Sequence, residues 1–273
     1  AGLSHPHIVP IHRVGEAAGF VFFVMGYVEG ETLGERLRAR GPLPPADAMR
    51  LLREVAWALA YAHGRGIVHR DVKPDNILLE AGTGRALVTD FGIAHVGAQV
   101  GPVTDPGRIM GTAHFMSPEQ AAIEPVDGRS DLYSLGVVGY QMACGDLPFN
   151  APNTPSMLVK HLSERPVPVE ERRLDLPPDL ARVIMILLEK DPANRFPDAT
   201  SVVTALSSGV MPTLRTAQAP ASVPAYGMIG SPGLSGYPSQ RDSSRATIAT
   251  RTGSGLRGQR VPSTDELDRW NAE

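Results

Sequence analysis

Two short polar stretches hold the side chains whose types and spacing could do chemistry. The first, residues 69–76, reads His-Arg-Asp-Val-Lys-Pro-Asp-Asn, and the second, residues 90–92, reads Asp-Phe-Gly. Asn76 and Asp90 offer hard oxygen ligands, the kind that Mg²⁺ takes while it keeps several of its waters. Either stretch alone can occur by chance in a loop-rich protein. Together, in this order and at this spacing, the two stretches are strong evidence of a catalytic site.

The two stretches together resemble the catalytic core of the protein kinase family, in its bacterial serine/threonine branch. A kinase does little covalent work and mainly holds magnesium, ATP and the acceptor in line. The resemblance implies that Asp71 orients the acceptor hydroxyl and takes its proton. It also implies that Lys73 offsets the charge of the transferred phosphate and favours serine or threonine over tyrosine. Asn76 and Asp90 are then the magnesium ligands.

Composition limits the alternatives. The chain has 273 residues with 42% hydrophobic content, which is typical of a globular protein, and its net charge of -3 gives no argument for nucleic acid or an anionic membrane as a partner. Its single cysteine, Cys144, excludes an intrachain disulfide and fits a reducing, cytoplasmic compartment. No apolar run reaches the roughly 20 residues that span a bilayer, although a longer parent could be anchored by a segment absent here.

Residues 1–16 resemble the end of the kinase regulatory helix running into the fourth strand. No Gly-x-Gly-x-x-Gly precedes residue 69, and the only lysines are Lys73, Lys160 and Lys190. We therefore expect the glycine-rich loop, the lysine-bearing strand and most of the regulatory helix to be absent. On this interpretation the chain is a fragment of a longer kinase and has little activity alone.

The nucleotide site implied by the resemblance follows a run of apolar residues. Residues 20–25, Phe-Val-Phe-Phe-Val-Met, are continuous rather than alternating, which predicts a buried strand. The next residues resemble the hinge between kinase lobes, where adenine is bound by the Gly26 carbonyl and the Val28 N–H. Met25 is the implied gatekeeper and Leu78 closes the adenine pocket from below. Gly26 replaces the usual glutamate, which loosens the hinge but preserves backbone recognition.

The elements that must position the catalytic loop can be predicted from local patterns. Residues 30–33 begin a short helix that ends at Gly41. Residues 46–63 form a longer helix with Pro45 in its first turn, and this helix presents the catalytic loop. Its apolar stripe has steps of four and three residues: Ala48, Leu52, Val55, Leu59 and Ala62. A hairpin follows, with strands at 77–79 and 86–88.

Residues 90–119 resemble the kinase activation segment. We hypothesise that phosphorylated Thr104 docks on Arg70, because a guanidinium fork pairs well with a doubly charged phosphate. The alternative is a flexible loop in which Thr104 is simply solvated. The resemblance places Thr112 as a bridge between the catalytic aspartate and Lys73.

A further set of residues is assigned to folding rather than to chemistry. The resemblance implies that Asp131, at the start of the central helix of the large lobe, accepts backbone N–H bonds from the catalytic loop. It pairs Arg195 with Glu119, and breaking such a pair when it is buried leaves an unpaired charge. His69 and Phe91 are also structural on this interpretation.

The predicted fold is the α+β protein-kinase fold, with a mostly helical large lobe and a partial small lobe. We expect residues 1–28 to be a remnant of the small lobe with the hinge, residues 29–208 to be the large lobe, and residues 209–273 to be a disordered basic tail rich in Pro, Gly and Ser.

The leading function is transfer of the ATP γ-phosphoryl group to serine and threonine hydroxyls of protein substrates, including autophosphorylation in trans. ATP and Mg²⁺ are the implied cofactors. The alternative is a catalytically silent pseudokinase module that binds partners through the large lobe and the tail. Intact Asp71, Asn76 and Asp90 favour the enzyme, since a silent module does not need both magnesium ligands.

Overall fold

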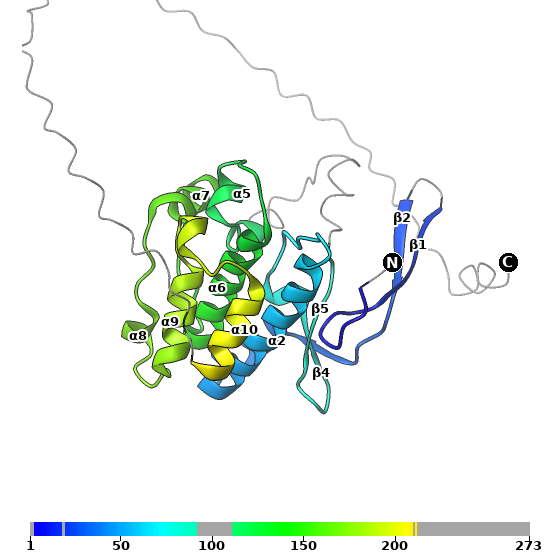
Figure 1. Ribbon diagram of the computed structural model, residues 1–273, viewed down its shortest axis with the longest axis horizontal. Coiled ribbons are helices and arrows are strands. Elements are labelled where there is room, and N and C mark those ends of the chain that lie inside the picture. The colour runs from blue at the N-terminus through cyan, green and yellow to red at the C-terminus, as the bar shows by residue number, and fades with distance from the viewer. Residues whose placement is uncertain (1–2, 18–19, 92–110, 210, 212–273) are drawn as a thin grey trace, which may run out of the picture. The chain divides into compact units, whose positions relative to one another are not determined.

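The structure of this chain is a computed structural model that describes residues 3–17, 20–91, 111–209 and 211. Contacts divide the chain into two units, Ala1–Ala221 and Ser222–Glu273. All described residues lie in the first unit, and they are the residues drawn in colour in Figure 1.

Helices make up about half of the described residues, and several of them begin at a side chain that caps the helix. Thr32, Ser117, Asn153 and Asp198 each accept a backbone N–H bond at a helix start. The helices are α1 (Leu33–Arg40), α2 (Pro45–His63), η1 (Pro74–Asn76), α5 (Pro118–Ala121), α6 (Gly128–Cys144), α7 (Thr154–Ser163), α8 (Val169–Arg172), α9 (Pro178–Leu187), η2 (Pro192–Asn194) and α10 (Ala199–Ser208).

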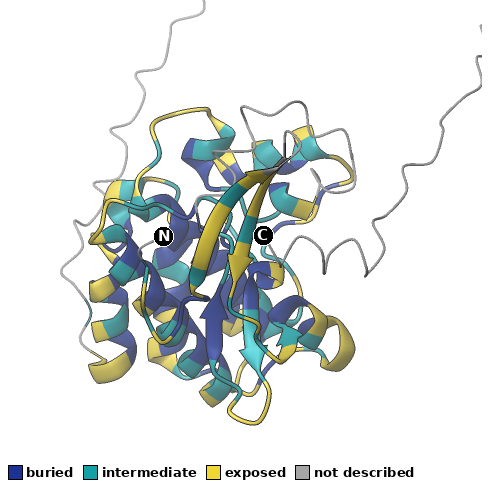
Figure 2. Cartoon of the chain, turned by 90° about the vertical axis from the view of Figure 1, so that its right-hand side faces the viewer, coloured by how far each residue is buried: buried dark blue, intermediate teal, exposed yellow. Residues whose placement is uncertain are grey.

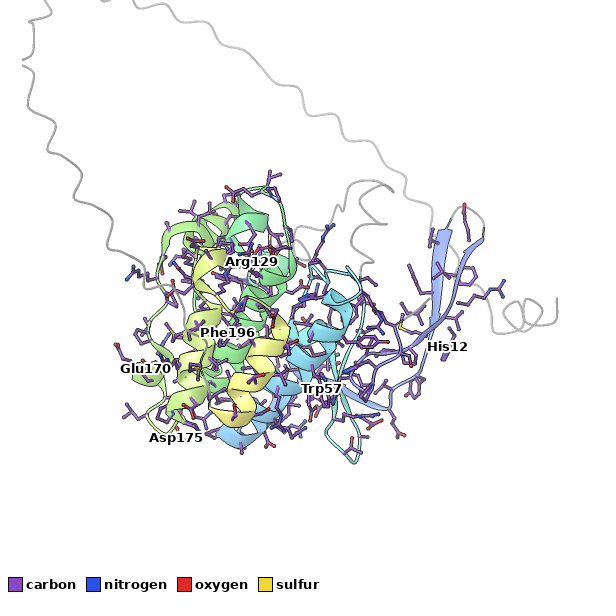
Figure 3. All side chains as sticks on the ribbon, in the orientation of Figure 1. His12, Trp57, Arg129, Glu170, Asp175 and Phe196 are labelled. Carbon is purple, nitrogen blue, oxygen red and sulfur yellow. The ribbon has the colours of Figure 1, made fainter. Side chains whose placement is uncertain are left out.

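The hydrophobic core lies between α2, α6, α9 and α10, which pack against one another (Figure 1). The apolar stripe predicted for α2 is buried, and Pro45 occupies its first turn as expected. α6 is buried over almost its whole surface, which is how a helix at the centre of a bundle behaves. Phe196 is fully buried within this helical body, whereas Trp57 on α2 is about half exposed (Figure 3).

A three-stranded antiparallel sheet lies beside α2, in the order β3 (Gly30–Thr32), β4 (Ile77–Glu80), β5 (Ala86–Val88). The predicted hairpin of β4 and β5 is confirmed. The expectation that a helix begins at residues 30–33 is wrong at its first residues, because 30–32 pair with β4. The helix starts only at Leu33, after Thr32 and Glu35 form a capping box. It ends at Gly41 as predicted.

The second sheet is a hairpin of β1 (Ile11–Ala17) and β2 (Phe20–Met25). The strand prediction for β2 is confirmed, but the prediction of burial is wrong. Val21, Phe22 and Val24 are 43%, 39% and 45% exposed, and Figure 2 shows both strands largely in the exposed and intermediate colours. In the part of the chain that the structure describes, no third strand joins this sheet, so its apolar side chains lack the neighbours that would cover them.

The segment before β1 also differs from expectation. Residues 3–10 contain no helix, although the sequence resembled the end of one. The backbone of this segment is instead bound to β5: the Val9 N–H donates to the Val88 carbonyl at 3.0 Å, and the Val88 N–H donates to the His7 carbonyl at 2.9 Å. These bonds attach the segment that leads into the hairpin to the large lobe.

The helices and the two small sheets occupy separate parts of the unit, which is the expected α+β arrangement. Among the described residues, no helix is both long enough and apolar enough to cross a membrane.

Candidate active site

The catalytic loop is attached to the N-terminal end of α6 through Asp131. This carboxylate is 1% exposed and accepts the N–H of His69 at 2.8 Å and the N–H of Arg70 at 2.7 Å. Arg70 has a φ of 68°, a left-handed conformation that a non-glycine residue adopts only when its surroundings hold it there. The geometry implied for Asp131 by the resemblance is therefore present.

His69 joins the catalytic loop to the segment that carries Asp90. Its Nε2 donates to the Thr89 carbonyl at 2.8 Å, and its Nδ1 accepts the N–H of Asp71 at 3.2 Å. The two bonds together require the tautomer with the proton on Nε2. The buried ring also lies 4.6 Å from the ring of Phe91, centroid to centroid. Both residues thus connect two parts of the site.

The side chains of Asp71, Lys73 and Asn76 meet at one point. Asp71 Oδ2 accepts bonds from Lys73 Nζ at 2.6 Å and from Asn76 Nδ2 at 3.0 Å. Asn76 Nδ2 also donates to the Asp71 backbone carbonyl at 2.8 Å. Asp71 Oδ1 is buried and has no hydrogen-bond partner among the described residues. One oxygen of the carboxylate is thus held by two hydrogen bonds, and the other accepts none from the described residues.

Thr112 reaches only one of its two expected partners. Its Oγ1 lies 3.3 Å from Lys73 Nζ, and among the described residues it makes no direct bond to Asp71. The expected bridge between Asp71 and Lys73 is therefore wrong in detail, because the lysine lies between the hydroxyl and the carboxylate. Thr112 acts on the loop through the lysine.

Asp90, Phe91 and Met25 line a mostly apolar cavity of about 230 Å³. Asp90 has a φ of 64°, and its carboxylate accepts one long bond of 3.4 Å from the Thr89 hydroxyl. Met25 Sδ lies 3.8 Å from that hydroxyl. This cavity is therefore lined both by a residue of β2, Met25, and by residues of the large lobe, Asp90 and Phe91.

Of the residues implied for adenine recognition, Met25 lines this cavity, whereas Gly26, Val28 and Leu78 do not. The Gly26 N–H donates to the Pro10 carbonyl at 2.8 Å. Among the described residues, the Gly26 carbonyl and the Val28 N–H have no hydrogen-bond partner. Leu78 lies in β4, opposite Thr32. The cavity therefore meets the implied adenine site only at Met25.

Arg195 is buried and binds Glu119 through two bonds, Nη1 to Oε1 at 2.7 Å and Nη2 to Oε2 at 2.9 Å. Its remaining donors bind the carbonyls of Arg129, Glu189 and Lys190. Burial by itself raises the pKa of Glu119, but the bonds from Arg195 and Ser130 outweigh it and leave that pKa below its ordinary value.

Two side chains that contact the catalytic loop or its anchor, Asp131, were not identified from the sequence. His63, the last residue of α2, donates from Nε2 to Asp131 at 2.8 Å. Gln120 donates from Nε2 to the Arg70 carbonyl at 2.8 Å. The available signal for Gln120 was the capping box Ser-Pro-Glu-Gln at the start of α5, which predicts a helix start but no contact with a distant loop.

Gly92 and Thr104 lie outside the described residues, and the docking of phosphorylated Thr104 on Arg70 stays a prediction.

The side chains of Lys190, Tyr133 and His161 form a hydrogen-bonded chain next to the segment that carries Thr112. Lys190 Nζ donates to the Tyr133 hydroxyl at 3.0 Å, so that hydroxyl donates in turn to His161 Nδ1 at 2.9 Å. Burial, with a smaller contribution from the Lys190 charge, lowers the pKa of His161 to about 4. His161 is therefore neutral in the folded protein at ordinary pH.

The neutral His161 predicts a pH dependence of stability. Its pKa is 6.5 ordinarily and about 4 when folded, so between these values the unfolded chain binds the extra proton. The free energy of unfolding should therefore fall as pH decreases from about 6.5 to about 4, by about 3 kcal/mol from this group. Urea unfolding at a series of pH values should show a shallower slope for His161→Gln. His12→Gln, at an exposed histidine, is the control; equal slopes for His161→Gln and wild type would contradict the assignment.

The fold and the site together define a domain of the protein-kinase type, with its catalytic loop held between α2 and α6. The chain matches the protein kinase domain family over residues 1–205, and it belongs to that family. The predicted family and fold are confirmed.

The relatives are bacterial serine/threonine kinases. The serine/threonine-protein kinase PknB of Mycobacterium leprae is 41% identical over 206 residues, which cover 74% of this chain and 33% of the relative. A probable serine/threonine-protein kinase of Clostridium perfringens is 41% identical over 203 residues, covering 74% and 29%. The crystal structure of the Mycobacterium tuberculosis PknI kinase domain is 30% identical with a TM-score of 0.59, covering 76% of this chain and 74% of that one. The chain spans about a third of the length of these curated relatives.

Proposed function

We propose that the protein carrying this chain transfers the γ-phosphoryl group of ATP to serine and threonine hydroxyls of protein substrates. The observation that carries the proposal is the Asp71 carboxylate, in which one oxygen is held by Lys73 and Asn76 and the other is buried without a hydrogen-bond partner. Membership of the protein kinase family and the serine/threonine kinases among the relatives support it. No observation favours the silent pseudokinase module.

In this proposal Asp71 is the catalytic base. Its open oxygen accepts the proton of the acceptor hydroxyl, whose oxygen then forms the bond to the γ-phosphorus while the bond to ADP breaks. Lys73 already lies 2.6 Å from Asp71, so its ammonium can offset the charge that gathers on the transferred group. Thr112 restrains that ammonium from the opposite side.

The residues present fit magnesium. The Asn76 amide nitrogen is committed to Asp71, which leaves the amide oxygen available, and the Asp90 carboxylate has a single weak partner among the described residues. Both are hard oxygen donors, the type that Mg²⁺ prefers. When bound, the ion offsets the charge on the ATP phosphates. For adenine, we propose the open Gly26 carbonyl and Val28 N–H, with Leu78 below the ring and Met25 as gatekeeper.

We propose that phosphorylation of Thr104, in trans by another copy, docks the activation segment on Arg70. The kinase domain acts on cytoplasmic protein substrates. The lack of a membrane-crossing helix among the described residues is compatible with this placement.

The proposal is tested by incubating the full natural protein with Mg-ATP and mapping phosphorylated residues by mass spectrometry. We expect phosphoserine and phosphothreonine, with Thr104 among the sites, and no phosphotyrosine. Asp90→Ala should weaken Mg-ATP binding in calorimetry but leave the weaker binding of ATP without magnesium unchanged. Folded protein that binds Mg-ATP yet modifies no hydroxyl would refute the proposed function, and an unchanged Mg-ATP affinity in Asp90→Ala would refute the ligand assignment.

A further inference from the structure

The residue directly before Asp71 is held on both sides. Arg70 has its φ at 68°, its N–H donates to Asp131 Oδ1 at 2.7 Å, and its carbonyl accepts from Gln120 Nε2 at 2.8 Å. That carbonyl lies in the same rigid peptide plane as the N–H of Asp71. The bond from Gln120 therefore fixes the orientation of the peptide group that leads into Asp71.

The side chain of Gln120 is itself fixed at its other end. Its Oε1 accepts the Ser117 N–H at 3.0 Å, and its backbone N–H donates to the Ser117 hydroxyl at 3.2 Å. Ser117 is fully buried. With the amide oxygen committed to Ser117, only the amide nitrogen can face Arg70, because the reverse orientation would set donor against donor and oxygen against oxygen. The contact thus needs an acceptor and a donor in one side chain.

Gln120 also lies close to the catalytic carboxylate itself. Gln120, Thr112 and Phe115 surround the same small gap as Asp71 and Arg70, and this gap has no room for a water molecule. The residue before Gln120, Glu119, is anchored in the core by Arg195. The chain segment that packs around Asp71 is therefore also the segment that orients the backbone before the carboxylate.

We infer that Gln120 is a positioning residue for phosphoryl transfer, which holds the left-handed backbone of Arg70 and so aims the Asp71 carboxylate at the acceptor hydroxyl. The inference rests on the proposed function of Asp71. Gln120 itself touches neither ATP nor the transferred group. Its loss should lower kcat while the KM for ATP stays near the wild-type value, because the nucleotide contacts come from other residues.

The test compares two variants of the full natural protein that break different bonds of the same side-chain pair. Gln120→Glu keeps an acceptor for the Ser117 N–H but loses the donor to Arg70 and sets a carboxylate oxygen against its carbonyl. Ser117→Ala removes the hydroxyl cap and leaves the bond from Gln120 to Arg70. We expect Gln120→Glu to lower kcat by about tenfold to a hundredfold, with the KM for ATP within about twofold of wild type. Ser117→Ala should retain kcat within about twofold even though it loses a helix cap.

A second readout needs no activity. Hydrogen exchange of the backbone amides in residues 69–76, followed by mass spectrometry, should be faster in Gln120→Glu than in wild type and unchanged in Ser117→Ala. If Gln120→Glu does not fold, Gln120→Met removes both amide bonds without adding a charge and takes its place. Unchanged exchange overturns the inference whether or not the protein is active.

The kinetic outcomes separate the inference from the function on which it rests. Wild-type kcat in Gln120→Glu, or an equal loss of kcat in Ser117→Ala, would overturn the inference and leave the proposed function intact. Wild-type protein that transfers no phosphoryl group to serine or threonine would instead refute the function.

Discussion

Asp71→Asn is expected to lower kcat by about 10²-fold to 10⁴-fold, the loss typical of a missing general base, and to leave the fold intact. An asparagine oxygen can still accept the bonds from Lys73 and Asn76 that the Asp71 carboxylate now accepts at 2.6 and 3.0 Å. Its amide nitrogen, however, takes the place of the open oxygen and cannot accept a proton. The substitution therefore removes the base and preserves the packing.

The matched control is Asp75→Asn, which removes a carboxylate four positions along the same loop. Asp75 is about half exposed and pairs with Arg38 at 3.2 Å, so we expect kcat to change by less than about twofold. Steady-state phosphorylation of a protein substrate, with circular dichroism as the check on folding, measures both variants. If Asp71→Asn failed to give soluble folded protein, Asp71 would have to be reassigned from chemistry to structure.

Arg195→Met is expected to lower the free energy of unfolding by about 3 to 5 kcal/mol, because it leaves the buried Glu119 without its partner. The side chains of Arg195 and Glu119 are 0% and 5% exposed, and the substitution also removes the bonds from the guanidinium to three backbone carbonyls. Methionine has a similar length and adds no polar group, so the effect comes from the lost bonds rather than from a cavity.

The control for this prediction is Arg38→Met, in an ion pair whose side chains are 66% and 52% exposed. Such a pair contributes less than about 1 kcal/mol. Urea unfolding followed by circular dichroism should separate the two variants clearly. Equal losses of unfolding free energy in the two variants would mean that Arg195 stabilises the fold through packing and not through its charge.

The same pair predicts a dependence on acid. Because the pKa of Glu119 is lowered below its ordinary value of 4.5, its contribution to stability is present above that value and is lost as pH falls through the lowered one. Wild-type protein should lose this contribution in acid, whereas Arg195→Met should already lack it at neutral pH.

Much of the active site could be predicted because its members are close along the chain. Asp71, Lys73 and Asn76 lie within one short loop, and their side chains meet in the structure. The bond from Lys73 to Thr112 shows the limit of this reasoning, since the expected direct contact of Thr112 with Asp71 is missing among the described residues. Motif order predicts which residues come together but does not predict the distances between their atoms.

The burial of β2 illustrates a second limit. A continuous apolar run predicts a strand because β-branched and aromatic residues fit an extended backbone. It does not reveal what covers the strand, and Val21, Phe22 and Val24 are exposed in a sheet of two strands. Burial depends on neighbours that local pattern does not describe.

The sequence by itself determined which residues come together in the catalytic loop, the long helix before it and the hairpin after it. These depend on residue types and on spacings of a few positions, which chain connectivity and helix periodicity enforce. Only the tertiary structure decided which side chains hold the loop from outside. Gln120 reaches Arg70 across 50 positions, and His63 reaches Asp131 across 68. Such contacts exist because the helices pack in one particular arrangement. That arrangement cannot be predicted from local sequence patterns.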